Sequence, residues 1–153
     1  MALLWRIPSL TDFERLHAAV RMVQHDIDRV LGSGAVTVVF VDDDPTAFTQ
    51  FESALGVTGA HGRPDAWAFV PPAEAATGLI AASPRVWSFF LSAVAEELQE
   101  VVMESTRFRG SATPPCPEHP NTPLWPAIVD DEAVWECIDG ADIQIPIGTF
   151  GSD

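Results

Sequence analysis

The chain has 153 residues, which is enough to bury a substantial core, and its 47% hydrophobic content is typical of a globular protein. Eight arginines, no lysine and 22 acidic residues give a formal net charge of -14. This charge would repel phosphate backbones and anionic membrane surfaces, so it argues against nucleic acid and membranes as partners and favours a basic protein.

The N-terminal residues lack a basic region ahead of a long apolar run, so they predict no secretory signal. The longest apolar segment, residues 86–95, is broken by two serines and is too short to span a bilayer. We therefore expect a cytoplasmic protein. In a reducing compartment its two cysteines are expected to be thiols or metal ligands rather than a structural disulfide.

Residues 12–31 form the first expected helix. Thr11 and Glu14 have the spacing of a capping box, and the glycine after the helix supplies a stop. Apolar residues recur at steps of three and four and predict a buried stripe, made of Phe13, Leu16, Val20, Val23, Ile27, Val30 and Leu31. His17 lies beside this stripe and His25 lies off it, so the two histidines are not expected to form a metal pair.

Residues 35–41 are rich in β-branched side chains and nearly uninterrupted in their apolar character, which predicts a strand covered on both faces. The segment 45–55 is favoured as a helix, because Asp44 can cap it, a proline occupies its first position and a glycine follows it. Side chains that alternate between residues 46 and 50 leave a hairpin strand as the alternative.

Two further strands and a second long helix follow. Residues 65–70 are a strand that two prolines end, and residues 79–81 are a short strand. Ser83 is the expected N-cap of the second long helix, which is predicted to begin at the next residue, a proline, and to run to about Arg107.

One side of this second helix combines acidic and apolar side chains. Its buried face points to the core, but Phe89 and Met103 fall on the opposite side together with Glu96 and Glu100. An exposed aromatic among carboxylates indicates a binding surface for a basic protein, made of Phe89, Glu96 and Glu100. The alternative is that strands or a second copy of the chain cover Phe89 and Met103, which would make a homo-oligomer.

The C-terminal part of the chain has a different composition. Residues 110–126 hold six prolines, which exclude a helix and indicate a linker. Residues 126–129 and 133–137 are then expected to form a hairpin, with 143–147 as a third strand.

These elements predict an α+β fold in which two long amphipathic helices pack on a small sheet, followed by a ribbon-like C-terminal hairpin. Residues 1–110 would form an acidic body, and residues 111–153 a proline-rich linker and hairpin tail. We expect the two parts to make one compact domain.

Both cysteines lie in the tail, in the pattern Cys116-Pro-Glu-His119 followed by Trp-Glu-Cys137, with seventeen residues between His119 and Cys137. A thiolate and an imidazole on one tight turn can reach the same tetrahedral ion, and the hairpin would bring the second cysteine alongside. The pattern resembles a zinc ribbon, which implies a structural Zn²⁺ ion. It departs from that family at the fourth ligand, which Asp139, Asp142 or a water would have to supply.

Two other interpretations of these cysteines stay open, namely a Cys116–Cys137 disulfide and two ordinary cysteines without a metal. A catalytic pair of Cys116 and His119 is disfavoured, because such pairs are usually assembled from distant segments.

Residues 38–45 resemble the first strand and the acidic pair of a response-regulator receiver domain, in which carboxylates at the end of a strand hold a magnesium ion. A receiver also needs a lysine and an acceptor aspartate at a later strand. The chain has no lysine, and residues 83–91 contain no aspartate. We therefore expect no receiver chemistry, although Asp42, Asp43 and Asp44 stay an alternative site for Mg²⁺ or Ca²⁺.

No set of residues in the sequence makes a convincing catalytic group. We expect a non-enzymatic interaction protein of the adaptor, inhibitor or immunity type, which binds a basic protein through the acidic side of the second helix. The alternative is a metal-binding enzyme or sensor that uses either Cys116, His119 and Cys137 or the aspartates at 42–44.

Overall fold

The computed structural model describes residues 11–56, 63–72 and 76–151. In these ranges the helices are α1 (Asp12–Leu31), α2 (Pro45–Leu55) and α3 (Trp87–Glu104). The strands are β1 (Thr37–Phe40), β2 (Ala66–Phe69), β3 (Ala76–Leu79), β4 (Pro115–Cys116), β5 (His119–Pro123), β6 (Trp125–Val129), β7 (Glu132–Glu136) and β8 (Gln144–Pro146). The expected mixture of helices and strands is confirmed. The strands form three small antiparallel sheets, however, with the orders β1-β2-β3, β4-β5 and β6-β7-β8.

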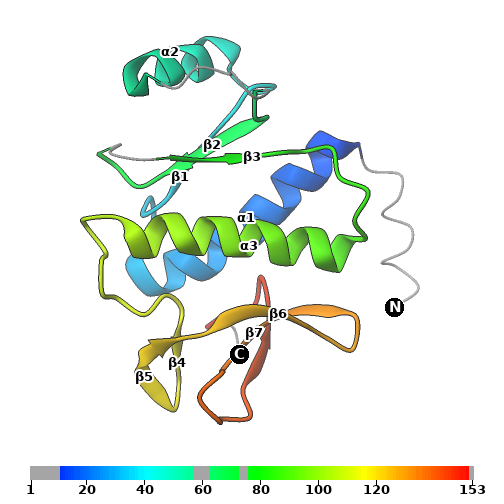
Figure 1. The fold of residues 1–153 in the computed structure, drawn as a ribbon, viewed down its shortest axis with the longest axis vertical. Coiled ribbons are helices and arrows are strands. Elements are labelled where there is room, and N and C mark those ends of the chain that lie inside the picture. The colour runs from blue at the N-terminus through cyan, green and yellow to red at the C-terminus, as the bar shows by residue number, and fades with distance from the viewer. Residues whose placement is uncertain (1–10, 57–62, 73–75, 152–153) are drawn as a thin grey trace.

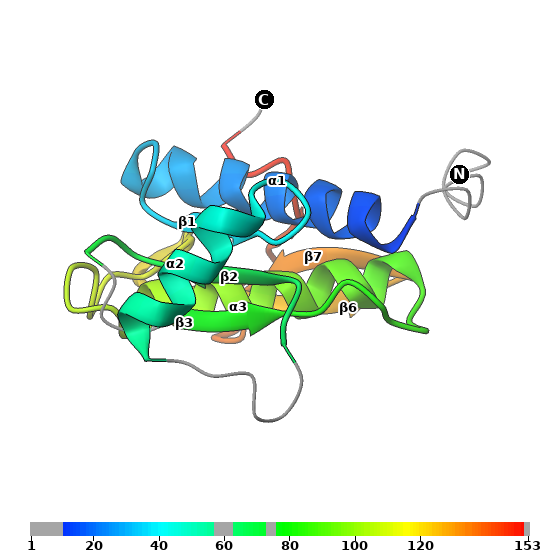
Figure 2. The ribbon, with the colours of Figure 1, turned by 90° about the horizontal axis from the view of Figure 1, so that it is seen from above.

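The layers differ from the expected pair of helices on one sheet. Helices α1 and α3 lie between the β1-β2-β3 sheet and the C-terminal strands (Figure 1). Helix α2 covers the other face of the β1-β2-β3 sheet (Figure 2), where Phe51 stacks on Phe69. The central helices therefore have an apolar layer on each side, and Leu16, Leu98 and Trp135 are fully buried in one continuous core.

The starts of α1 and α2 follow the sequence prediction. The side chain of Thr11 accepts the backbone N–H of Glu14, and Glu14 accepts the N–H of Thr11, both at 3.1 Å. Asp44 caps α2 by accepting the N–H of Ala47 at 3.0 Å, and Gly56 ends it in the left-handed conformation. The helical interpretation of residues 45–55 is thus confirmed over the strand.

No helix in the described ranges combines the length and the apolar character needed to cross a bilayer.

The expected start and end of the second long helix were wrong. Helix α3 begins at Trp87, because the guanidinium of Arg15 on α1 donates to the carbonyls of Ser83 (3.4 Å) and Arg85 (2.8 Å) and holds them in an extended segment. The hydroxyl of Ser83 accepts the N–H of Arg85 instead of capping the helix. At the other end, Ser105 is the C-cap, so α3 ends about three residues earlier than expected.

Two strands of the first sheet also differ from expectation. Strand β1 is shorter than predicted, and its residues are half-buried. The third strand occupies Ala76–Leu79, where residues 79–81 were expected, because the side chain of Asp65 accepts the N–H of Ala81 at 2.7 Å. That hydrogen bond takes residue 81 out of the pairing with β2.

The proline-rich segment is more ordered than the linker that was expected. It contains the hairpin of β4 and β5, in which Cys116 lies opposite His119. The predicted hairpin follows as β6 and β7, joined by Asp130 and Asp131, which both have positive φ (51° and 64°), as a two-residue turn between twisted strands requires. Strand β8 pairs with β7, so the C-terminal ribbon is a three-stranded sheet.

Candidate functional site

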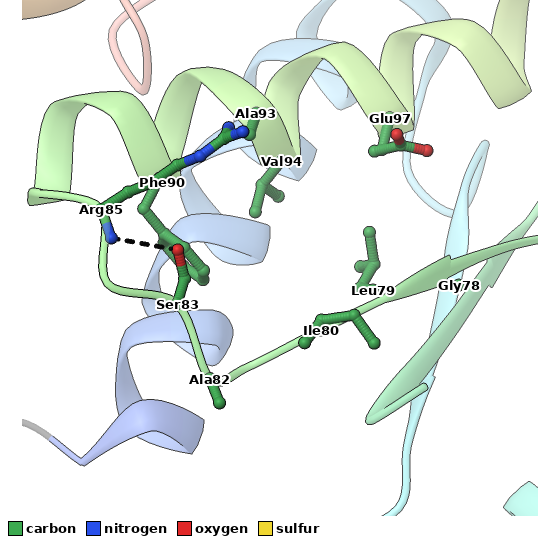
Figure 3. Close-up of a pocket in the computed structure, with 10 residues that line it drawn as sticks. All are labelled: Gly78, Leu79, Ile80, Ala82, Ser83, Arg85, Phe90, Ala93, Val94 and Glu97. Atoms are coloured by element: carbon green, nitrogen blue, oxygen red, sulfur yellow. Dashed lines mark hydrogen bonds between the residues drawn. The ribbon is translucent and has the colours of Figure 1, made fainter. Parts of the chain in front are cut away.

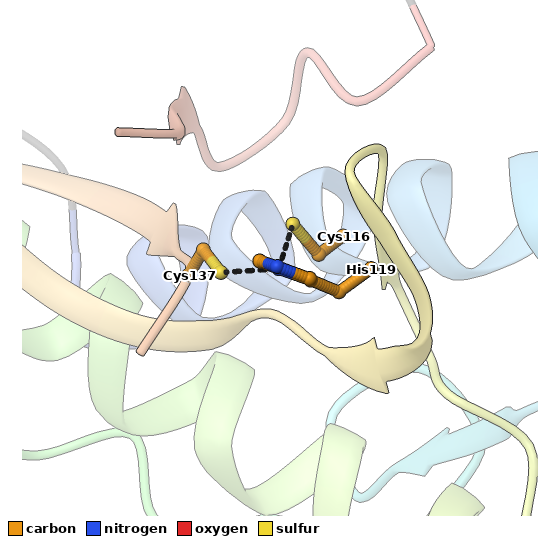
Figure 4. A group of neighbouring side chains, drawn as sticks. All are labelled: Cys116, His119 and Cys137. Atoms are coloured by element: carbon orange, nitrogen blue, oxygen red, sulfur yellow. Dashed lines mark hydrogen bonds between the residues drawn. The ribbon is translucent and has the colours of Figure 1, made fainter. Parts of the chain in front are cut away.

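The two hairpins place the three expected metal ligands. Cys116 ends β4 and His119 begins β5, and the tight turn between them directs both side chains to the same side. Cys137 follows directly on β7 in the neighbouring sheet. All three side chains point toward one another (Figure 4).

The distances in this group suit a tetrahedral metal ion. Nδ1 of His119 lies 3.7 Å from Sγ of Cys116 and 3.4 Å from Sγ of Cys137, and the three atoms all lie within 4.8 Å of one another. A tetrahedral Zn²⁺ with ordinary bond lengths separates a sulfur from a nitrogen ligand by about 3.5 Å. The two observed distances lie on either side of that value, so an ion fits between the side chains with little movement.

The environment of Cys137 favours its metal-binding thiolate form. Both cysteines are buried free thiols, and His119 is partly buried. Burial raises the pKa of the Cys137 thiol, but hydrogen bonds from the backbone of Asp139, from His119 and Cys116, and from the backbone of Ala141 outweigh burial and lower the pKa. The thiolate is the form that binds a metal, and two thiolates would balance the charge of a divalent ion.

The fourth ligand is not part of this group. Among the described residues, the cluster of mutually close ligand atoms consists of Cys116, His119 and Cys137. Asp139 and Asp142 are exposed, and the backbone of Asp139 contacts the sulfur of Cys137. The role of the Asp139 carboxylate as a ligand stays a prediction.

A second cluster joins His17 to the aspartates after β1. Nε2 of His17 lies 3.0 Å from one carboxylate oxygen of Asp42 and 3.1 Å from the other, and 3.9 Å from an oxygen of Asp43. The imidazole stacks on Phe40, with ring centroids 3.8 Å apart. Asp44 caps α2 instead. The sequence linked neither His17 nor Phe40 to these aspartates, because the contact depends on how α1 crosses the end of the strand.

The acidic side of α3 is exposed as expected. Phe89 is 49% exposed, and Glu96 and Glu100 are exposed one helical turn apart. Beside them lies a groove of about 520 Å³, named here the acidic groove, which is lined by Glu96, Gln99, Glu100, Met103, Glu104, Trp125 and Pro126. Phe89 is not among these lining residues.

Sequence reasoning missed three residues of the acidic groove, namely Gln99, Trp125 and Pro126. Trp125 begins β6 and is 38% exposed, and Gln99 is buried on α3. A lone tryptophan among six prolines was a signal for Trp125, but its approach to α3 depends on the packing of the C-terminal sheet.

A second pocket of about 280 Å³ lies between β3 and the first turns of α3 (Figure 3). It is mostly apolar, and two of its polar side chains, those of Glu97 and Ser83, are hydrogen-bonded within the protein. Glu97 accepts the hydroxyl of Thr77 at 2.6 Å, and Ser83 accepts the N–H of Arg85. No histidine, cysteine or aspartate lines it, and its one glutamate, Glu97, is hydrogen-bonded to Thr77 rather than to Ser83.

Comparisons with family models, curated proteins and solved structures gave no match to this chain. The functional interpretation therefore rests on the two features whose geometry suits a ligand. These are the Cys116, His119 and Cys137 group, which suits a soft metal ion, and the acidic groove, which suits a cation.

Proposed function

We propose that the chain is a non-enzymatic protein-binding domain with a structural Zn²⁺ ion held by Cys116, His119 and Cys137. The observation that carries the metal site is the position of the His119 Nδ1 atom, 3.7 Å and 3.4 Å from the two thiol sulfurs. Two thiolates and an imidazole bind zinc in preference to calcium or magnesium.

A structural role follows from where the ligands lie. Cys116 and His119 belong to the β4-β5 hairpin, and Cys137 follows the neighbouring sheet, so an ion would join two small sheets. Small metal sites of this kind contribute their binding energy to folding. The Asp139 carboxylate or a water would complete the coordination shell.

The test is a measurement of metal content on the untagged full chain, followed by thermal melts with and without a chelator. We expect one zinc per chain. At a free zinc concentration of one hundred times Kd, binding stabilises the fold by about 2.7 kcal/mol. For a domain of this size that corresponds to a melting temperature about 5–11 °C higher than in chelator.

Substitution of the histidines provides a matched control. His119→Gln should remove the zinc and the thiolate-to-cobalt absorption bands of a cobalt-loaded sample, whereas His25→Gln should leave both unchanged, because His25 lies outside both groups of candidate ligands among the described residues. Absence of bound zinc, together with identical melts in zinc and chelator, would refute the metal site.

The acidic groove supports the second part of the proposal, which is that the domain binds a basic protein. Three carboxylates and a tryptophan line the same hollow, and the net charge of the chain is -14. Such complementarity mainly speeds association and excludes wrong partners.

This part is tested by affinity capture with identification of the bound proteins. Capture should weaken with added salt and with the double substitution Glu96→Lys and Glu100→Lys. The control is Asp130→Lys with Asp131→Lys, which makes the same change of charge at the β6-β7 turn. Capture that resists both salt and the Glu96 and Glu100 substitutions would refute the acidic side of α3 as the binding surface.

A further inference from the structure

The carboxylates of the acidic groove have no positive partner within the protein. Glu96, Glu100 and Glu104 stand at successive turns of α3, and all three are exposed. No cation in the described part of the chain forms an ion pair with any of them. Like charges at this spacing destabilise a helix by about 0.2–0.5 kcal/mol per pair, so the row is costly unless a cation from outside occupies the groove.

The opposite wall of the groove is aromatic. Trp125 begins β6 and lies 38% exposed, so part of its indole is available to a ligand. Tryptophan is the side chain whose ring face attracts cations most strongly. Carboxylates on one wall and an indole on the other are complementary to a flat cation.

Gln99, which also lines the groove, has a side-chain oxygen that lacks a hydrogen-bond donor. Its side chain is 1% exposed, and its Nε2 atom donates to the carbonyls of Thr113 (3.1 Å) and Leu124 (2.5 Å). Both partners are acceptors, so they fix the orientation of the amide and turn its oxygen away from them. That oxygen is buried and has no hydrogen-bond partner. The Thr113 hydroxyl is likewise buried without a partner. An unpaired buried acceptor costs about 1–3 kcal/mol, so this part of the groove lining is incompletely hydrogen-bonded.

The carboxylates do not form a metal site of the kind that Cys116 and His119 make. In the described residues, the groups of three ligand atoms within 4.8 Å of one another do not include Glu96, Glu100 and Glu104. Successive members of the row are four residues apart, or about 6 Å along the helix axis. An extended cation with several donors suits this row better than a single ion.

From these contacts we infer that the acidic groove binds the side chain of an arginine in a basic partner protein, a conclusion that rests on the proposed protein-binding function. The guanidinium is flat, carries five N–H donors and stacks on aromatic rings. It can face the Trp125 indole and donate to the carboxylates of Glu100 and Glu104, which line the same groove as Gln99. A lysine ammonium is a compact and strongly hydrated charge, so it would use fewer of these groups.

The test follows the indole N–H signal of Trp125 by NMR in the full chain with zinc present. The signal is assigned by its loss in Trp125→Phe. The probes are two blocked tripeptides, acetyl-Gly-Arg-Gly-amide and acetyl-Gly-Lys-Gly-amide, which carry the same charge. We expect a saturable shift with the arginine peptide and about fivefold weaker binding of the lysine peptide, as the loss of one cation–π contact predicts.

Matched variants separate the groove from the overall charge. Glu100→Gln with Glu104→Gln should weaken the arginine peptide about fivefold or more, as the loss of two charged hydrogen bonds predicts. Asp130→Asn with Asp131→Asn removes the same charge at the β6-β7 turn and should change its affinity less than twofold.

Three results would overturn the arginine site. These are no shift of the Trp125 signal, equal affinity for the two peptides, and equal weakening by the two double variants. If capture of a basic protein is still lost with the Glu96 and Glu100 substitutions while Trp125 does not respond, the arginine site is refuted and the proposed function stands. If capture does not depend on α3 but the peptide binds as expected, the arginine site stands and the proposed binding of a basic protein through α3 is refuted.

Discussion

A buried carboxylate on α1 holds the C-terminal segment, and its replacement tests the packing of the whole domain. Asp26 is fully buried. It accepts hydrogen bonds from the indole of Trp135 (2.7 Å) and from the backbone N–H groups of Gly148 (2.6 Å) and Phe150 (3.0 Å). His25 lies 2.9 Å from the same carboxylate. We predict that Asp26→Asn will be strongly destabilising although it changes almost no volume.

The magnitude follows from these contacts. The amide oxygen of the asparagine can keep the two donors that share one carboxylate oxygen, Trp135 and Gly148, but without the charge. Its NH₂ group then faces the N–H of Phe150, where two donors meet. Hydrogen bonds to charged groups contribute about 1.5–3 kcal/mol each, so the lost bond and the weakened pair together should cost about 3–4 kcal/mol. For a domain of this length, that lowers the melting temperature by about 6–16 °C.

Thermal and urea unfolding followed by circular dichroism measure this effect, and the near-ultraviolet signal reports on Trp135 directly. Asp130→Asn is the control, because Asp130 is exposed at the β6-β7 turn and the same atoms change. A difference of about 2 °C corresponds to about 1 kcal/mol or less in a domain of this length. A melting temperature of Asp26→Asn within that range of the control would refute the view that this carboxylate anchors the C-terminal segment.

Three further variants test other parts of the fold. Asp131→Gly should raise the free energy of unfolding by about 0.5–1 kcal/mol in urea titrations, because glycine adopts the positive φ of this turn without strain, and a loss of stability would contradict the turn geometry. The hydrogen bond from Arg63 holds the pKa of Glu52 below its ordinary value of 4.5, although burial opposes this and the Trp67 indole assists. Because the pKa is lowered in the folded state, its contribution is complete above that ordinary value and is lost as the pH falls through the folded value. Glu52→Gln should therefore lower the melting temperature at neutral pH and narrow its gap to the parent chain on acidification, whereas a gap independent of pH would contradict this. Leu98→Ala should lower the free energy of unfolding by about 2–5 kcal/mol, because it leaves a cavity beneath α3. The control, Glu96→Ala, changes an exposed residue of the same helix and should have little effect. Equal losses of stability in the two variants would contradict the assigned buried face of α3.

The parts of the fold that the sequence predicted are those whose causes lie within a few residues. The capping box of Thr11 and Glu14, and the cap that Asp44 gives to α2, act over three residues. The start of α3 was wrong because Arg15, 68 residues before Ser83 in the chain, binds the carbonyls that precede the helix. Local propensity cannot report such a contact.

The candidate sites divide in the same way. Cys116 and His119 lie on one turn, and the predicted hairpin was enough to bring Cys137 to them. The acidic groove needs Trp125 to approach Glu100 across two elements, which depends on the packing of the C-terminal sheet against α3. Sequence reasoning therefore found one wall of the groove and missed the other.

The anchoring of the C-terminal segment also determines when the protein can fold during its synthesis. Asp26 lies in the first helix, but its donors at Trp135, Gly148 and Phe150 follow 109, 122 and 124 residues later. At ribosomal rates of about 5–20 residues per second, α1 waits about 6–25 s for those partners. Throughout that interval its apolar stripe has no complete core to enter. The core around Asp26 can therefore be completed only after residue 150 leaves the exit tunnel.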